Sequence, residues 1–279
     1  MSKNTEHIKS DQERIAYVQA RRKQEQSIQI ILSVFGVLLF FIIWESLVAS
    51  GLVSGRYLSS PTKVIALFFT KLTDPAPDGA TIQINILSSL QVALVGFALA
   101  IVIGIPLGWL MGWYKGFDAF ARPIFEIIRP IPPVAWIPLT IVWMGIGLRA
   151  KAFVVFFSAF VPCLINAYTG IKQTNQTLID FSKTCGASNW TTFCRIGIPS
   201  SLTMVFAGVR IALGNAWATL VAAEMLASAS GLGYMILMGR QFARPDLIIL
   251  GIVVIGAIGV FFTWILGLVE NRFLGWKKL

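Results

Sequence analysis

Residues 82–113, IQINILSSLQVALVGFALAIVIGIPLGWLMGW, lie within the longest uncharged stretch of the chain. A helix rises about 1.5 Å per residue, so this stretch can cross a hydrocarbon core of about 30 Å. Five further stretches are predominantly apolar and of comparable length. They are residues 28–49, 121–147, 152–171, 201–227 and 247–269. The sequence therefore predicts an all-α integral membrane protein with six transmembrane helices.

The composition agrees with a chain that is solvated by lipid. Of 279 residues, 56% are hydrophobic and 13% are charged, whereas soluble domains average about 45–50% apolar and about 25% charged residues. The only histidine is His7, and the dipeptide Gly-Lys never occurs. These facts exclude a histidine metal cluster, a Ser-His-Asp triad and a Walker A loop. We expect no catalytic residue, metal site or cofactor in this chain, and we expect any ATP and Mg²⁺ to be bound by a partner ATPase.

Lysine and arginine are distributed unevenly between the two sides of the predicted membrane. With the N-terminus inside, the inner segments hold fourteen of the 23 basic residues and the outer segments hold seven. Inner loops collect Lys and Arg, so we predict that both termini and the loop 172–200 are cytoplasmic. The predicted organisation is a tail over 1–27, a six-span domain over 28–270 and a second tail over 271–279.

Glycines recur at every fourth position near the end of the second span. They are Gly104, Gly108, Gly112 and Gly116. This spacing places them on one helix face, where they permit close helix packing. The alternative is that glycine is simply common in membrane helices, and close packing is the favoured interpretation.

The third span is interrupted by the sequence RPIPPVAWIP at residues 129–138. Four prolines in this stretch cannot form a regular helix, because each proline lacks a backbone N–H and clashes with the preceding turn. Broken backbone at membrane depth persists only where it is buried in protein or lines a cavity. We therefore predict a broken helix beside a cavity.

Polar side chains near this break and in the fifth span are the candidates for a solute pathway, because charges are costly at membrane depth. The candidate residues are Arg129, Pro132, Trp136, Arg210, Asn215, Trp217 and Glu224. The alternative is structural pairing. Glu126 and Arg129 are one helical turn apart, and for them pairing is favoured. For Glu224, a gating role and a packing role are equally supported.

The loop 172–200 is polar, but residues 177–185 have the pattern of a short helix that ends at Gly186. Pro199 then begins the next span. Apolar side chains of this helix, including Phe181, would be exposed unless the helix docks on something. Docking on a partner protein and folding back on the membrane domain are equally supported by these residues alone.

This loop resembles the EAA loop of binding-protein-dependent ABC transporter permeases, whose pattern is Glu-Ala-Ala-x-x-x-Gly followed further on by Pro. Asp180-Phe181-Ser182, Gly186 and Gly197-Ile198-Pro199 occupy the corresponding places. Asp replaces Glu, and Phe and Ser replace the two alanines. The segments 129–138, 220–226 and 231–235 resemble signatures of the nitrate, sulfonate and taurine importer permeases, with the taurine and alkanesulfonate branch the most similar.

The resemblance covers residues 28–276 and implies a type I importer permease fold in the cell membrane of a prokaryote. It implies a dimer, here expected to be a homodimer, two cytoplasmic ATPase subunits that bind the loop helices, and an extracytoplasmic binding protein that delivers the solute. Nucleic acid is not an expected partner. The residues expected to couple transport to the ATPase are Asp180, Phe181, Ser182, Lys183, Gly186 and Pro199. Phe181 is the expected apolar plug, with Asp180 and Lys183 as its charged edge.

The function implied is that of the permease subunit of an ATP-driven importer for a small anion such as taurine or an alkanesulfonate. Permeases of the same type for nitrate, bicarbonate, an aromatic acid or a vitamin precursor are the alternatives. An ion-coupled secondary transporter is less favoured, because no inverted repeat is visible and few acids are present for a proton relay. A simple membrane anchor would not need a proline-broken span.

Overall fold

The structure is a computed structural model that describes residues 25, 28–29 and 31–273. The chain forms two compact units, residues 1–63 and 64–279. The predicted six-span domain, 28–270, includes parts of both units. The two predicted tails lie outside the described residues, apart from Glu25 and residues 271–273.

The first unit contains an apolar helix over Ile31–Ala49. Glu45, the acid near the end of this helix, accepts hydrogen bonds from the backbone N–H and the hydroxyl of Thr62, at 3.2 and 2.9 Å. Thr62 lies in the first turn of α2 (Pro61–Thr70). A carboxylate at this position satisfies one of the free N–H groups at a helix start.

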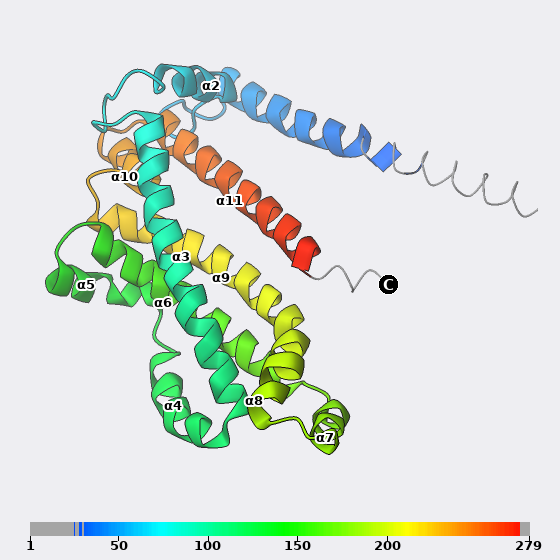
Figure 1. Cartoon of the computed structure of the whole chain (residues 1–279). Coiled ribbons are helices and arrows are strands. Elements are labelled where there is room, and N and C mark those ends of the chain that lie inside the picture. The colour runs from blue at the N-terminus through cyan, green and yellow to red at the C-terminus, as the bar shows by residue number, and fades with distance from the viewer. Residues whose placement is uncertain (1–24, 26–27, 30, 274–279) are drawn as a thin grey trace, which may run out of the picture. The chain divides into compact units, whose positions relative to one another are not determined.

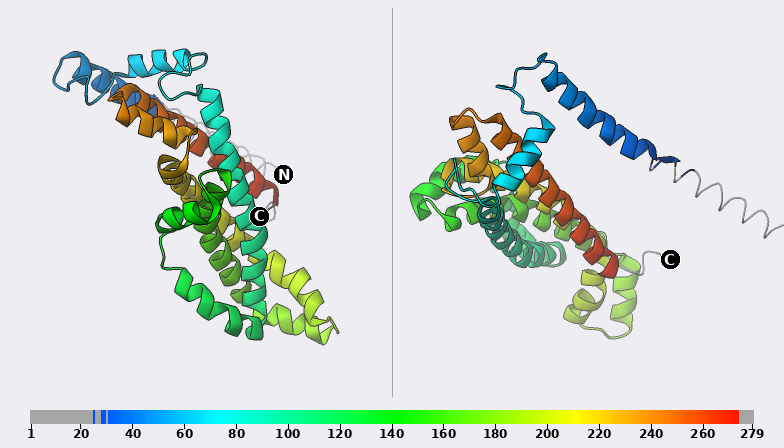
Figure 2. Two further views of the ribbon diagram at one scale, coloured as in Figure 1. Left: turned by 90° about the vertical axis from the view of Figure 1, so that its left-hand side faces the viewer. Right: turned by 90° about the horizontal axis from the view of Figure 1, so that it is seen from above.

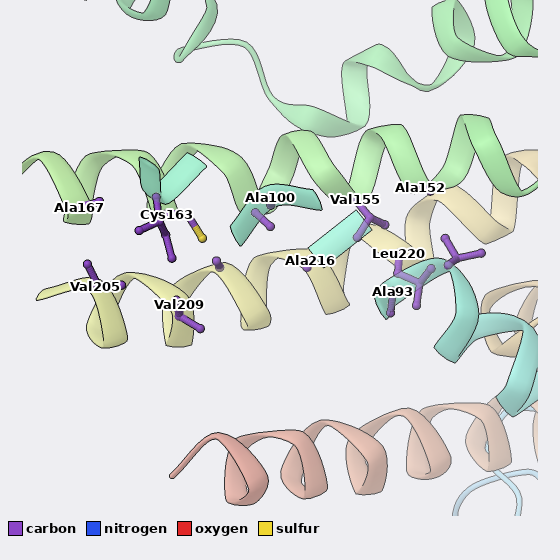
Figure 3. Close-up of a cluster of buried hydrophobic side chains, with 14 residues drawn as sticks. Ala93, Ala100, Ala152, Val155, Cys163, Ala167, Val205, Val209, Ala216 and Leu220 are labelled. Carbon is purple, nitrogen blue, oxygen red and sulfur yellow. The ribbon is translucent and has the colours of Figure 1, made fainter. Parts of the chain in front are cut away.

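Three long helices form the core of the second unit: α3 (Ile82–Trp113), α6 (Leu148–Lys172) and α9 (Ile198–Ala227). They lie side by side in all views (Figures 1 and 2). Their shared apolar cluster is built mainly from small side chains, as the close-up shows (Figure 3). Members of this cluster include Ala93, Ala100, Ala152, Val155, Ala159, Cys163, Ala167, Val205, Val209, Ala212 and Ala216. Small residues let helix backbones approach closely, which is the main source of packing energy between helices in lipid.

The predicted glycine face packs closely against α6. A Cβ atom at Gly104 would lie 3.2 Å from the Cβ of Cys163, and one at Gly112 would lie 2.8 Å from the Cβ of Ile171. The prediction of close packing is therefore confirmed for α3. It is wrong for Gly116, which belongs to the next helix and has open space around it, because α3 ends at Trp113 and the chain turns there.

The other helices of the second unit are arranged around this core. Their bounds are α4 Lys115–Ile128, η1 Pro133–Trp136, α5 Ile137–Met144, α7 Gln176–Thr184, α8 Asn189–Thr192, the π-helical turn η2 Phe193–Gly197, α10 Leu232–Gln241 and α11 Pro245–Phe273. α7 and α8 lie at the end where α3 finishes, and α10 lies at the opposite end (Figures 1 and 2).

A second apolar cluster lies at the α10 end. It joins α2, α10 and α11 to the start of α3, and its buried members are Val64, Leu67, Ile82, Leu232, Met235, Leu247, Leu250 and Val254. The cluster packs α10 against α11, and α10 also contacts α9.

Five helices are long and apolar enough to cross a membrane among the described residues, and a sixth span is counted if the bent pair Lys115–Ile128 and Pro133–Met144 is one span. The fold is therefore all-α with five or six spans. The helix that contains the predicted fifth span starts earlier than 201, because α8, η2 and α9 form one continuous apolar element over Asn189–Leu226.

Candidate solute pathway and coupling surface

The third span is broken as the prolines predict. α4 ends at Ile128, the chain resumes as η1 at Pro133, and the two helical pieces are bent by 82° relative to each other. Pro130 and Pro132 lie in the break, where a missing N–H removes no helical hydrogen bond. The break therefore frees the backbone between α4 and α5 to line a cleft.

A cleft of about 280 Å³ lies beside this break, and we call it the central cleft. Its lining residues come from the break, α6 and α9: Arg129, Ile131, Pro133, Ser158, Val161, Pro162, Asn215, Ala218 and Thr219. The hydroxyls of Ser158 and Thr219 are 2.8 Å apart. The cleft thus combines a guanidinium, a carboxamide and two hydroxyls within an otherwise apolar wall.

Among the residues that the structure describes, Arg129 is the only charged one that lines the central cleft. Among residues 31–273, the side chain of Arg129 makes no ion pair and no hydrogen bond. The expected pair with Glu126 is wrong. Glu126 instead accepts a hydrogen bond from Nε of Arg122 at 3.1 Å, since Arg122 lies one turn earlier on the same helix face. This leaves the guanidinium of Arg129 available to an anion.

Arg210 and Trp217 line a different cleft, between α9 and α11, with a volume of about 590 Å³. Arg210 forms an ion pair with Glu270 of α11. The indole N–H of Trp217 donates to the carbonyl of Ile255 at 3.0 Å. Of the candidate pathway residues in the fifth span, only Asn215 therefore lines the central cleft together with Arg129.

Trp136 and Pro132 frame the break without lining the central cleft. Pro132 precedes η1, and the ring of Trp136 packs against Phe157 of α6 with centroids 5.4 Å apart. These contacts support the short helices after the break. The roles of both residues in transport stay predictions.

Glu224 is completely buried in α9 and fully paired. Its carboxylate accepts from the hydroxyl of Ser89 and from the backbone N–H of Gly233, the latter at 2.8 Å. The hydroxyl of Ser89 also accepts from the N–H of Leu232 at 2.9 Å. Two free N–H groups at the start of α10 are thereby satisfied. This geometry favours the packing role over the gating role for Glu224.

A second buried network continues from there toward the loop before α3. Lys71 and Asp78 form a buried ion pair. Asp78 also accepts from the amide of Asn85 at 2.7 Å, and Asn85 accepts from the N–H of Gly231 at 2.9 Å. Sequence reasoning missed this network. The available signal was the polar pair Asn85 and Ser89, four residues apart on one face of a predominantly apolar helix.

The predicted coupling helix is α7, one residue earlier than expected. Its first turn is capped by the side chain of Asn175, which accepts from the N–H of Thr177 at 2.9 Å. Gly186 has φ +82°, the left-handed conformation expected for the residue that ends the helix. Phe181 is 69% exposed, so the described residues do not cover it. This exposure argues against the alternative in which the helix folds back on its own membrane domain.

Two other predicted coupling residues make side-chain hydrogen bonds, one within α7 and one to α8. Asp180 accepts from the side chain of Gln176 at 2.9 Å, and the hydroxyls of Ser182 and Thr192 are 2.9 Å apart. Lys183 is exposed in the last turn of α7, and Pro199 lies in the first turn of α9. The coupling roles of these residues stay predictions.

The loop is tied to the core through α8 and η2. Phe193 is buried, and its ring lies 5.4 Å from the rings of both Trp113 and Trp190. The indole N–H of Trp113 donates to the side chain of Asn189 at 3.2 Å. A displacement of α7 would therefore be transmitted to the ends of α3 and α9.

Three comparisons place this architecture among known proteins. Residues 101–275 match the family of binding-protein-dependent transport system inner membrane components. A putative ABC transporter permease of Methanocaldococcus jannaschii is 37% identical over 196 residues, 70% of this chain and 73% of the relative. The taurine transport system permease of Escherichia coli is 31% identical over 251 residues, 89% of this chain and 90% of the relative.

The methionine ABC transporter in an inward-facing conformation has a similar fold. Its matched chain is 20% identical with a TM-score of 0.50, and the match covers 64% of this chain and 93% of that one. The fold is thus that of a type I importer permease. Relatives named for aliphatic sulfonates, nitrate and bicarbonate confirm the predicted subgroup.

The chain belongs to the family of binding-protein-dependent transport system inner membrane components. It is a multi-pass membrane permease subunit of an ABC transporter, a transport component and not the ATPase. Membership of this family implies an ATPase and a binding protein as partners.

Proposed function

We propose that this chain, paired with a second copy, forms the membrane pathway of an importer for a small organic anion, taurine or an alkanesulfonate. The observation that carries the proposal is the guanidinium of Arg129, which lines the central cleft and has no partner within residues 31–273. Arginine binds oxyanions through two parallel N–H donors, and a sulfonate offers oxygens in a matching arrangement. The relatives named for taurine and aliphatic sulfonates support the same chemical class.

The other polar groups of the central cleft would complete the site. The side-chain N–H₂ of Asn215 can donate to an anion, and so can one hydroxyl of the hydrogen-bonded pair Ser158 and Thr219, because only one of the two protons is used within the pair. The prolines break the helix beside these side chains, so some backbone polar groups there lack a helical hydrogen bond. Such backbone is suited to line a polar path.

The two ends of the core are also assigned to opposite sides of the membrane. The α7 end faces the cytoplasm, where an ATPase binds ATP and Mg²⁺ and contacts α7, and the α10 end faces the binding protein. Both termini lie in the cytoplasm of a prokaryotic cell, in agreement with the positive-inside distribution of Lys and Arg.

The test is ATP-driven uptake of radiolabelled taurine and ethanesulfonate by the complete complex in proteoliposomes. Arg129→Gln should lower uptake about tenfold or more, because one charge-assisted hydrogen bond to an anion contributes about 1.5–3 kcal/mol. Arg129→Lys keeps the charge and should retain part of the activity.

Arg210→Gln is the comparison, because Arg210 was also predicted to contact solute but is paired with Glu270. Uptake is normalised to the amount of assembled complex. A larger loss with Arg129→Gln supports a path along the broken third span. Wild-type uptake of both solutes by Arg129→Gln contradicts the proposal, and preferential uptake of nitrate or bicarbonate assigns the alternative solutes.

A further inference from the structure

A second cleft, of about 220 Å³, lies between α4 and α6. Arg129 lines both this α4–α6 cleft and the central cleft. The α4–α6 cleft also includes Asp118 near the start of α4, and Tyr168 and Thr169 near the end of α6. Both positions are close to the α7 end of the core. Arg129 therefore borders both clefts, and the lining of the second one extends toward the α7 end of the core.

The two clefts differ in charge. Of the described residues, Arg129 alone brings a charge to the central cleft, whereas the α4–α6 cleft adds Asp118, Arg122 and Glu126. The added groups are two carboxylates and one guanidinium. An anion that moves from the central cleft into the α4–α6 cleft therefore meets one net negative charge more. By Coulomb's law its affinity for Arg129 falls along this path.

Glu126 is positioned to compete directly for Arg129. It lies four residues after Arg122 and three residues before Arg129, and Arg129 continues the helical conformation of α4. Both arginines are thus neighbours of Glu126 on one helix face. Glu126 accepts from Nε of Arg122 at 3.1 Å, and its side chain is 59% exposed, so packing does not hold it there.

Arg122 is itself held on the far side of the cleft. Its Nη1 atom lies 3.8 Å from Asp118, and its guanidinium lies 5.7 Å from the ring centroid of Tyr168. These contacts keep Arg122 beside Glu126 in this conformation. With Glu126 engaged by Arg122, Arg129 is left without a carboxylate partner.

We propose that the α4–α6 cleft is a second anion site, from which the solute is released, and that Glu126 is the carboxylate that displaces it. In the solute-binding state Glu126 pairs with Arg122 and Arg129 holds the anion. During release Glu126 moves to Arg129, and the anion leaves past Tyr168. The inference rests on the proposed function in one respect, namely that Arg129 binds the solute anion.

Two substitutions should have opposite effects on anion binding. The measurement is the affinity of the full-length chain in nanodiscs for ethanesulfonate, by ligand-detected NMR. Glu126→Gln removes the competing charge and should tighten binding about threefold, the scale of one partly exposed ion pair. Arg122→Gln frees Glu126 to occupy Arg129 and should weaken binding by a similar factor. The double variant should bind like Glu126→Gln.

If the pair of Arg122 and Glu126 is merely structural, both substitutions should change the affinity for ethanesulfonate in the same direction. That result would overturn the inference. Unchanged affinity in both variants also overturns it. In the complete complex, Glu126→Gln should slow taurine turnover in spite of its tighter binding. Glu270→Gln is the matched control, because it removes a carboxylate from an Arg–Glu pair outside both clefts, and it should leave ethanesulfonate affinity unchanged.

Arg129→Gln separates this inference from the proposed function. If it leaves ethanesulfonate binding unchanged, Arg129 is not the anion site and both fail. If it weakens binding while the other two variants do not diverge, only the release role of Glu126 fails. Should Arg122→Gln not fold, Glu126→Gln decides alone: tighter binding supports the inference, and unchanged or weaker binding overturns it.

Discussion

The hydroxyl of Ser89 in α3 lies 2.7 and 2.9 Å from the two carboxylate oxygens of Glu224 in α9, 135 residues further along the chain. Both residues are completely buried. The same hydroxyl accepts from Leu232 at the start of α10. One side chain therefore joins three helices at the end of the core opposite α7, and it supplies the buried carboxylate of Glu224 with a donor in addition to the N–H of Gly233.

Loss of this hydroxyl should destabilise the protein. Ser89→Ala leaves the carboxylate of Glu224 and the N–H of Leu232 each short of a partner, and an unsatisfied buried polar group costs about 1–3 kcal/mol. The measurement is thermal unfolding of the purified chain in detergent. Ser200→Ala, an exposed site near the other end of α9, is the control and should unfold like the wild type. Equal unfolding temperatures for the two variants would contradict the role of Ser89.

The buried pair of Lys71 and Asp78 should show strong non-additivity. Removal of one partner leaves an uncompensated buried charge and costs about 3–5 kcal/mol, whereas removal of both costs less. We expect Lys71→Met and Asp78→Asn each to lower the unfolding temperature more than the double variant does. Additive losses in this cycle would show that the two side chains do not act as a pair.

Helix packing in the core makes Gly112 sensitive to enlargement. A Cβ atom at this position would lie 2.8 Å from the Cβ and Cγ2 atoms of Ile171, so Gly112→Ala should force α3 and α6 apart and lower stability by about 1–3 kcal/mol. Gly116→Ala is the matched control, since nothing lies within 4 Å of its added methyl group. Stability is compared by thermal unfolding. A Gly112→Ala variant as stable as Gly116→Ala would refute close packing at this position.

Coupling to the ATPase should depend on the exposed face of α7. Phe181→Ala removes an aromatic side chain that would fill a pocket of the partner, and such anchors contribute about 2 kcal/mol or more at interfaces. We expect reduced co-purification of the ATPase, or loss of solute-stimulated ATP hydrolysis, with normal membrane insertion. Gly186→Val should act similarly, because a β-branched residue cannot adopt the left-handed turn cheaply.

Phe242 offers the control for that experiment, because it is also an exposed aromatic residue but lies between α10 and α11. Phe242→Ala should leave ATPase association unchanged. If Phe181→Ala and Gly186→Val both retain wild-type association and stimulation, α7 is not the coupling element.

Topology can be tested by cysteine labelling in intact cells. We expect Ser188→Cys, next to α8, to be protected from an impermeant thiol reagent, because the proposed orientation places that end in the cytoplasm. Gly79→Cys, in the loop before α3, should be labelled from outside. The assay uses a background in which Cys185 and Cys194 are replaced, since both are at least partly accessible. Labelling of Ser188→Cys from outside would reverse the proposed orientation.

Local sequence was sufficient for features that depend on neighbours along the chain. The uncharged stretch 82–113 became one helix with those bounds, since its length and apolarity leave no other structure in lipid. The prolines after Arg129 broke the third span because the missing N–H groups act locally. The turn at Gly186 follows from its freedom at positive φ.

Pairings between distant residues required the tertiary structure. Glu126 has an arginine about one helical turn away on either side, Arg122 and Arg129. Both spacings place the two charges on one helix face, so periodicity alone could not predict which arginine pairs with Glu126. Arg210 and Asn215 lie five residues apart on α9, yet they line different clefts, since a helix turns by about 100° per residue. Ser89 and Glu224 meet only because the small residues of the core bring α3, α6 and α9 together. Contacts across such distances depend on which helix faces pack, and no local pattern specifies that choice.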